Sequence, residues 1–185
     1  MELPIRVYVL RRLRQEAGFG LIELLMAMTI LNIGILAVVA AFNSGIVTLR
    51  RSGMTATASV LADKQMELYR SLTYGEIALD PSSIPATTPY TSDTAYSSTQ
   101  VTVTCTTPLP AQCNASQTTT GPDRRPYRVD TYIVDDHPAG TAGRVVRKVT
   151  IVVRDGKNLG KVLARSTSTF DCSTALPYGP GCPTT

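Results

Sequence analysis

Near its N-terminus, at residues 19–49, the chain has a long apolar stretch that contains only one charged residue. Between Phe19 and Leu49 the single charge belongs to Glu23. A helix of about 20 apolar residues is long enough to cross a bilayer, and this stretch exceeds that length. The first part of the chain is therefore predicted to be a membrane-spanning helix that carries one acid.

That acid is expensive to keep in a membrane. An ionisable side chain there usually faces a partner of opposite charge and marks a functional site, so the question is which cation Glu23 meets. The residues around it read Gly18-Phe19-Gly20-Leu21-Ile22-Glu23-Leu24-Leu25-Met26-Ala27. This segment closely resembles the processing signal of type IV prepilins and of the related pseudopilins of type II secretion. In that family a prepilin peptidase cuts after the glycine and N-methylates the new first residue.

The resemblance implies roles for three residues. Gly18 would end the leader, Phe19 would become the methylated N-terminus, and Glu23 would pair with the Phe19 amine of a neighbouring subunit. Coulomb attraction in the low-dielectric core of a filament favours that pairing. Gly20 departs from the family, which most often has threonine there. A glycine in the first helical turn costs little, because that turn lacks N-terminal hydrogen-bond partners.

Two other interpretations of the N-terminal part remain. An ordinary secretory signal peptide would use the basic residues within positions 6–14 as its n-region and Val39-Ala40-Ala41 as its cleavage site. Glu23 and the apolar character that continues past Ala41 weigh against it. A plain signal anchor agrees with the positive-inside rule, but it leaves the sequence around Glu23 unexplained.

The chain is predicted to have four parts. These are a cytoplasmic leader (1–18), a membrane-spanning and filament-core helix (19–49), an amphipathic half of the same helix (50–75) and an extracytoplasmic globular head (76–185). Without the leader, 14 basic residues face 12 acidic ones, which is not the excess typical of nucleic-acid-binding proteins. A head of about 110 residues can bury one modest core, so we expect a single domain.

The helix is predicted to continue to about residue 73, because no proline interrupts it, with Gly75 as its C-cap. A stripe at three-to-four spacing predicts that its second half packs on the head. The stripe consists of Leu61, Gln65, Leu68 and Leu72. The charged residues expected mostly on the outer face are Arg50, Arg51, Lys64, Glu67 and Arg70.

The head is predicted to consist of strands separated by long surface loops. Segments rich in Val, Ile, Thr or Tyr favour strands at 99–104, 127–134, 144–154 and 160–170. Segments rich in proline and hydroxyl residues favour loops at 80–98 and 106–126.

Two local patterns refine this prediction. Alternation within 127–134 indicates a half-buried strand, and Asp155-Gly156-Lys157-Asn158 indicates a hairpin turn. The predicted fold is therefore α+β, with an antiparallel sheet of about four strands resting on the amphipathic half of the helix.

The four cysteines are Cys105, Cys113, Cys172 and Cys182. An even number in an exported chain predicts disulfides, and sequential pairing would close two short loops, although three pairings are open. Neither neighbouring pair has Cys-x-x-Cys spacing and the chain has one histidine. Zinc is therefore the poorer interpretation, and we expect no metal.

The head contains few candidate catalytic or ligand-binding residues. The acidic segment 135–137 could bind a cation, but the further oxygen ligands of a calcium loop are not recognisable nearby. The basic residues of 123–125, with Arg128, could touch DNA phosphate, but they form a small patch that would release few counterions. No nucleophile can be matched with a base and an orienting group. We therefore expect no enzyme activity and no cofactor.

The expected function is that of a structural subunit of a type IV pilus or a type II secretion pseudopilus. The residues from Leu68 to Tyr74 are similar to the helix end of minor pilins and minor pseudopilins, which favours a minor or priming subunit. The implied partners are other pilin or pseudopilin subunits, the prepilin peptidase and methyltransferase, the inner-membrane assembly platform and membrane lipid, with DNA less supported.

The expected location is the cytoplasmic membrane, in a single pass with an extracytoplasmic head, and afterwards a surface or periplasmic filament. The alternative is a signal-anchored adhesin or DNA-binding receptor that does not polymerise.

Overall fold

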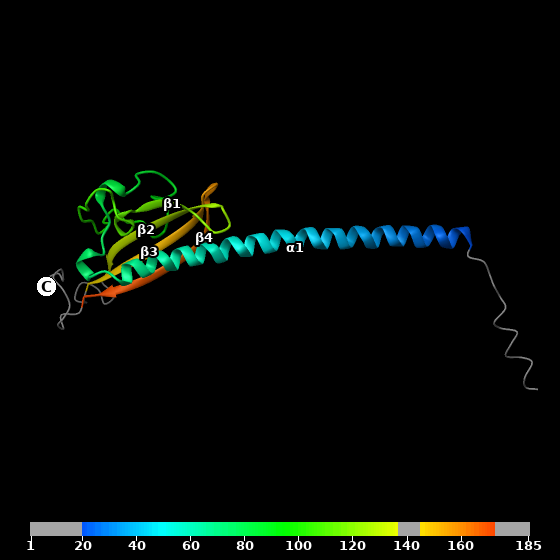
Figure 1. Ribbon diagram of the computed structural model, residues 1–185, viewed down its shortest axis with the longest axis horizontal. Coiled ribbons are helices and arrows are strands. Elements are labelled where there is room, and N and C mark those ends of the chain that lie inside the picture. The colour runs from blue at the N-terminus through cyan, green and yellow to red at the C-terminus, as the bar shows by residue number, and fades with distance from the viewer. Residues whose placement is uncertain (1–19, 137–144, 173–185) are drawn as a thin grey trace, which may run out of the picture. The chain divides into compact units, whose positions relative to one another are not determined.

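The computed structural model describes residues 20–136 and 145–172. The chain divides between Leu49 and Arg50 into two compact units. Helix α1 (Leu21–Arg70) contributes its first part to one unit and its last part to the other. The second unit also contains a four-stranded sheet (Figure 1).

Helix α1 ends earlier than its sequence predicts. Its last residue is Arg70, and Gly75 is not its C-cap but lies in a short 3₁₀ turn, Tyr74–Glu76. That turn is fixed by Thr73, whose backbone N–H and hydroxyl both donate to the Glu76 carboxylate, at 3.0 and 2.9 Å. This capping interaction begins the 3₁₀ turn directly after α1.

The sheet is an antiparallel meander in the order β1-β2-β3-β4. Its strands are β1 (Ser116–Thr120), β2 (Pro126–Asp136), β3 (Val146–Asp155) and β4 (Asn158–Asp171). The last two are joined by the predicted turn, in which Asp155 pairs with Asn158. The predicted α+β fold is confirmed.

One predicted strand is wrong and another was missed. Residues 99–104 form only an isolated parallel bridge, between Thr102 and Leu79. The backbone there is extended but bonds two different neighbours: Val101 N–H donates to the Ile133 carbonyl and Val103 N–H to the Leu79 carbonyl. The first strand of the sheet instead lies at Ser116–Thr120, inside the segment predicted to be a loop.

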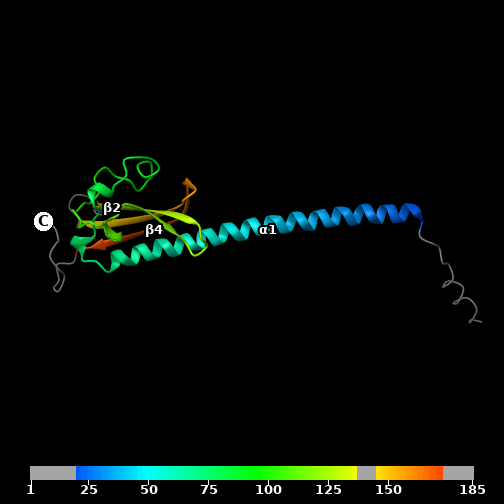
Figure 2. The same cartoon turned by 45° about the horizontal axis from the view of Figure 1, so that its top comes forward.

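One face of the sheet is covered by the second half of α1 (Figures 1 and 2). The helix residues buried there are Met54, Ala58, Ala62, Gln65, Met66 and Tyr69. Of the predicted stripe, Gln65 is buried, but Leu61, Leu68 and Leu72 are only partly buried, so most of the stripe was misplaced by about one residue. The small side chains of Ala58 and Ala62 are fully buried, so the helix backbone can approach the strands closely.

Tyr69 is the last buried residue of this helix face, and it carries a hydroxyl group. Burial raises its pKa to about 12. Its hydroxyl therefore stays protonated at neutral pH and donates to the Gln112 carbonyl at 2.7 Å. The bond ties the end of α1 to the loop that precedes β1.

The other face of the sheet is covered by the part of the segment 77–115 that contains Tyr90. Tyr90, which is fully buried, stacks on Tyr132 of β2 with ring centroids 4.4 Å apart. The Tyr90 hydroxyl donates to the Thr131 carbonyl at 2.7 Å. The prediction of a half-buried β2 is thus wrong: Asp130 and Tyr132, on the face opposite the helix, are as buried as their neighbours. Residues 80–98, which were predicted to form a surface loop, therefore contribute to the hydrophobic core through Tyr90.

Candidate functional site

The first candidate site lies at the start of α1. The Gly20 carbonyl accepts the backbone N–H groups of Glu23 and Leu24, at 2.9 and 3.2 Å, and so closes the first helical turn. Glu23 lies in that turn and is exposed. The helix dipole favours a carboxylate at this position. The predicted cleavage residues Gly18 and Phe19 lie outside the described residues.

The helix that follows Glu23 is apolar on every side. All residues from Leu21 to Leu49 are exposed, and their large hydrophobic side chains are between 46% and 78% exposed. A helix that is hydrophobic all round requires lipid or other protein around it. By length and composition, α1 can span a membrane. The predicted apolar helix is present, and in water this surface would have no favourable environment.

Glu23 is therefore an acid at the end of an apolar rod. Within the part of the chain that the structure describes, no cation pairs with its carboxylate. Transfer of an unpaired carboxylate into an apolar environment is costly. A positive group from outside the described residues would remove this cost where this end of the helix leaves water.

Residues 13–39 match the family model described as the prokaryotic N-terminal methylation motif. The chain carries a type IV prepilin signal. The match includes all three residues assigned above from resemblance, namely Gly18, Phe19 and Glu23. No curated protein and no solved structure matches the chain.

The prepilin signal gives the apolar helix a biochemical context. It supports a type IV pilin-like precursor that is processed by a prepilin peptidase and assembles with other pilin subunits. Cleavage after Gly18 would leave the Phe19 amine four residues before Glu23. The cleavage position and the Glu23 pairing stay predictions.

The head carries the first predicted disulfide. Cys105 and Cys113 are bonded, with their Cα atoms 6.5 Å apart. Cys172 is also in a disulfide, and Cys182 lies outside the described residues. A bond that closes a short loop adds roughly 2–3 kcal/mol to the free energy of unfolding. The Cys105–Cys113 loop carries residues 110–113, next to α1.

Asp80 holds this disulfide loop in place, a role that the sequence did not reveal. Its backbone N–H donates to the Cys113 carbonyl at 2.8 Å, and its carboxylate accepts the Cys105 N–H at 2.9 Å. Hydrogen bonds from the Ser82 hydroxyl and from the Cys105 and Ser82 backbones lower the pKa of Asp80. The carboxylate is thus a structural acceptor.

The structure also shows where the two weaker candidate sites of the head lie, namely the acidic segment 135–137 and the basic patch around Arg128. Asp135 pairs with Arg147, whose Nε lies 3.0 Å from the carboxylate, and His137 lies outside the described residues. Among the described residues no group of three ligating side chains could hold a metal ion. In the basic patch, Arg128 is paired with Asp130 at 2.8 Å, which leaves fewer free cations for a phosphate backbone than the sequence suggested.

Arg128 belongs to a buried ionic network that crosses the sheet. Asp130, fully buried on β2, accepts from Arg128 and Arg154, at 2.8 and 3.0 Å. Arg154 of β3 also bonds Asp93, which in turn accepts from Arg165 of β4 at 2.8 Å. The network ties the segment around Asp93 to three strands.

We expect Arg154→Met to lower the free energy of unfolding by about 3–5 kcal/mol, because it leaves two buried carboxylates without their shared cation. The measurement is urea unfolding of the full chain in detergent, followed by tyrosine fluorescence. The matched control is Arg70→Met on the exposed face of α1, where loss of the pair with Glu67 should cost less than about 1 kcal/mol. Equal effects of the two variants would contradict this account of the network.

Asp93 also predicts a dependence of stability on pH. Burial by itself would raise the pKa of Asp93, but the Ala95 N–H and the guanidinium groups of Arg165 and Arg154 outweigh it and lower the pKa. The unfolded value is about 3.9. The stabilisation is therefore complete above about pH 4 and is lost as the pH falls through the lower folded-state value.

The measurement is a series of urea unfolding curves of the full chain from neutral to acidic pH. Asp93→Asn should be less stable at neutral pH and should lose less further stability on acidification than the wild type. Asp63→Asn, an exposed position on α1, should follow the wild-type curve. An unchanged acid slope in Asp93→Asn would show that other carboxylates set the pH dependence.

Proposed function

We propose that the chain is a structural subunit of a type IV pilus or a type II secretion pseudopilus, present as a minor or priming subunit. The observation that carries the proposal is an apolar helix, exposed on all sides, that begins with a prepilin signal and a single acid. A filament of packed helices would replace lipid around such a surface without exposing it to water.

The mechanism is mechanical rather than catalytic. In the membrane the helix is held by burial of its apolar side chains in lipid. Extraction is tolerable only if neighbouring helices take the place of the lipid and if the Glu23 carboxylate meets a cation. The methylated amine of Phe19 in the adjacent subunit supplies that cation. The pairing fixes the axial position of the incoming subunit.

The rest of the proposal concerns location and partners. The precursor spans the cytoplasmic membrane once with the head outside, is cut by the prepilin peptidase, and is drawn into the filament by the inner-membrane assembly platform. The similarity of the end of α1 to minor subunits supports a low copy number. In this proposal the head forms part of the outer surface of the filament and has no enzyme activity.

The test is the mature N-terminus of the chain recovered from cells. Mass spectrometry of the membrane and sheared-filament fractions should find an N-methylated phenylalanine that corresponds to Phe19, in both fractions. An intact Met1 in the membrane fraction, together with no chain in sheared filaments, would favour an anchored receptor that does not polymerise. Cleavage near Ala41 would indicate a freely secreted head and would reject both.

A further inference from the structure

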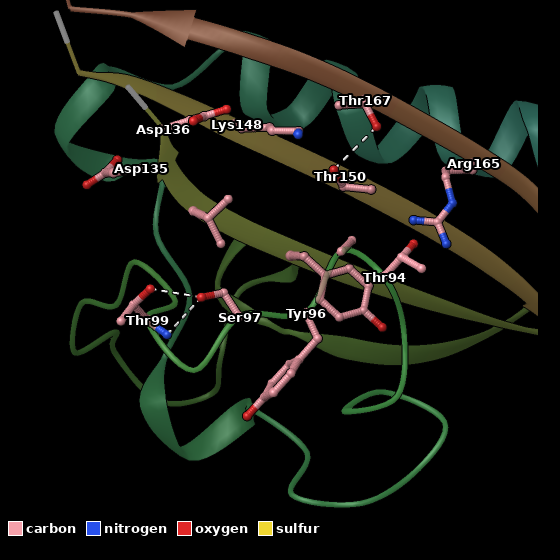
Figure 3. Close-up of a pocket in the computed structure, with 13 residues that line it drawn as sticks. Thr94, Tyr96, Ser97, Thr99, Asp135, Asp136, Lys148, Thr150, Arg165 and Thr167 are labelled. Atoms are coloured by element: carbon pink, nitrogen blue, oxygen red, sulfur yellow. Dashed lines mark hydrogen bonds between the residues drawn. The ribbon is translucent and has the colours of Figure 1, made fainter. Parts of the chain in front are cut away.

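The head has a polar groove that the proposed function does not use. The groove has a volume of about 430 Å³ and lies on the sheet face opposite α1, between strands β2 to β4 and residues 94–99 (Figure 3). Ligand sites in proteins usually have volumes of about 300–1,000 Å³. The groove is therefore large enough for a small ligand.

The lining is built mainly from hydroxyl groups. On the loop side, the hydroxyls of Ser97 and Thr99 lie 2.8 Å apart, and on the strand side those of Thr150 and Thr167 lie 3.3 Å apart (Figure 3). Each hydroxyl can both donate and accept, so each pair can open and bond a ligand instead. The two pairs face the groove from opposite sides.

Four charged residues, namely Asp135, Asp136, Lys148 and Arg165, complete the lining. Lys148 and Asp136 have no ion-pair or hydrogen-bond partner among the described residues. Arg165, in contrast, is held by Asp93, to which it bonds at 2.8 and 2.9 Å. The groove thus offers one available ammonium, which can only donate, and one available carboxylate, which accepts.

This set of groups excludes several ligand classes. An apolar ligand would leave the hydroxyls without hydrogen bonds. A nucleic acid or another polyanion would meet one free cation beside a free carboxylate, which is far from the basic surface that such ligands need. A hard metal ion needs six or more oxygen ligands. Because Asp135 is already engaged by Arg147, Asp136 is the one unpaired carboxylate among the described residues that line the groove.

We infer that the groove binds a carbohydrate of one or two sugar residues. Sugar hydroxyls donate and accept in the same way as the hydroxyls that line the groove, and Lys148 and Asp136 add a fixed donor and a fixed acceptor. Tyr96, partly buried with its ring 5.9 Å from that of Tyr90, also lines the groove on the loop side. The ionic network that anchors Asp93 holds the loop side against the strands, so the groove is preformed.

The inference is tested with the purified full chain in an amine-oxide detergent, because detergents with sugar headgroups would compete for the groove. The probe is a printed array of mammalian, plant and bacterial glycans, followed by ligand-observed NMR titration of the strongest binder as a free oligosaccharide. We expect saturable binding. Lys148→Gln should weaken it at least tenfold, and so should the double variant Thr150→Val with Thr167→Val.

Matched controls are Lys157→Gln in the β3–β4 turn and Thr118→Val on exposed β1, which lie outside the groove and should bind as the wild type does. Because Thr150 is buried, the fold of the double variant is checked by thermal unfolding, and Lys148→Gln, at the groove surface, provides the decisive test if that variant unfolds. No binding on the array, binding unaffected by Lys148→Gln, or equal loss in the controls would each overturn the inference. The assay does not depend on filament assembly.

Discussion

Glu23→Ala is expected to remove the chain from sheared filaments while leaving membrane insertion and cleavage intact. The apolar segment becomes more hydrophobic without the acid, so it still inserts. In the proposed filament, however, the methylated Phe19 amine of the neighbouring subunit would lose its carboxylate and stay unpaired in an apolar core. We expect at least a tenfold loss of incorporation, measured by immunoblotting of the sheared and membrane fractions, which corresponds to about 1.4 kcal/mol or more.

Two further variants separate the charge from other effects. Glu23→Gln keeps the size of the side chain and should fail in the same way, because the missing quantity is charge. Asp63→Ala removes an exposed acid from the second half of α1 and should assemble normally. Normal levels of Glu23→Ala in sheared filaments would refute the proposed pairing.

Gly18→Glu is expected to block processing. The resemblance to prepilins predicts a cut after Gly18, and a long charged side chain at that position would occupy the space in which the peptidase accepts a glycine. The precursor should accumulate in the membrane with its 18 leader residues attached. The measurement is an electrophoretic shift against the wild type, confirmed by intact mass. The fraction of the chain that is processed should fall to less than about a tenth of the wild-type value, which corresponds to a cleavage barrier higher by roughly 1.4 kcal/mol.

The control for this experiment is Gly20→Ala. A methyl group at Gly20 would meet the Ile22 side chain at 3.8 Å, an ordinary van der Waals contact, so the start of α1 should be undisturbed and processing should continue. If Gly18→Glu matured at the wild-type rate, the cleavage position assigned to residues 18 and 19 would be wrong. The assembly hypothesis would then need a different N-terminal residue.

The parts of the fold that follow local rules were predictable from the sequence. Helix α1 has a long proline-free run and the Asp155–Asn158 turn has a short-range signal, and both are present. The strand β1 was not predictable, because Ser116–Thr120 contains no apolar residue. Its pairing with β2, rather than its own composition, makes it a strand.

The buried charges of the head were missed for a related reason. Asp130 lies in a segment of alternating pattern, which usually indicates a solvent-facing side chain, and Arg154 lies next to the turn at the end of β3. Their burial depends on Asp93 and Tyr90, which are distant in the sequence and belong to a segment predicted to lie on the surface. The position of the prepilin signal, in contrast, could be inferred from ten consecutive residues because its information is entirely local.

The second half of α1 has a consequence for how the head can be handled. Because Met54, Ala58, Ala62 and Met66 form one wall of the core, a soluble fragment must start near Arg50 to keep that wall. A fragment that starts after Tyr74 would expose the apolar face of β2 and β3 and would aggregate. Within this second unit, a pull on the strands would therefore reach the second half of α1 through its buried side chains.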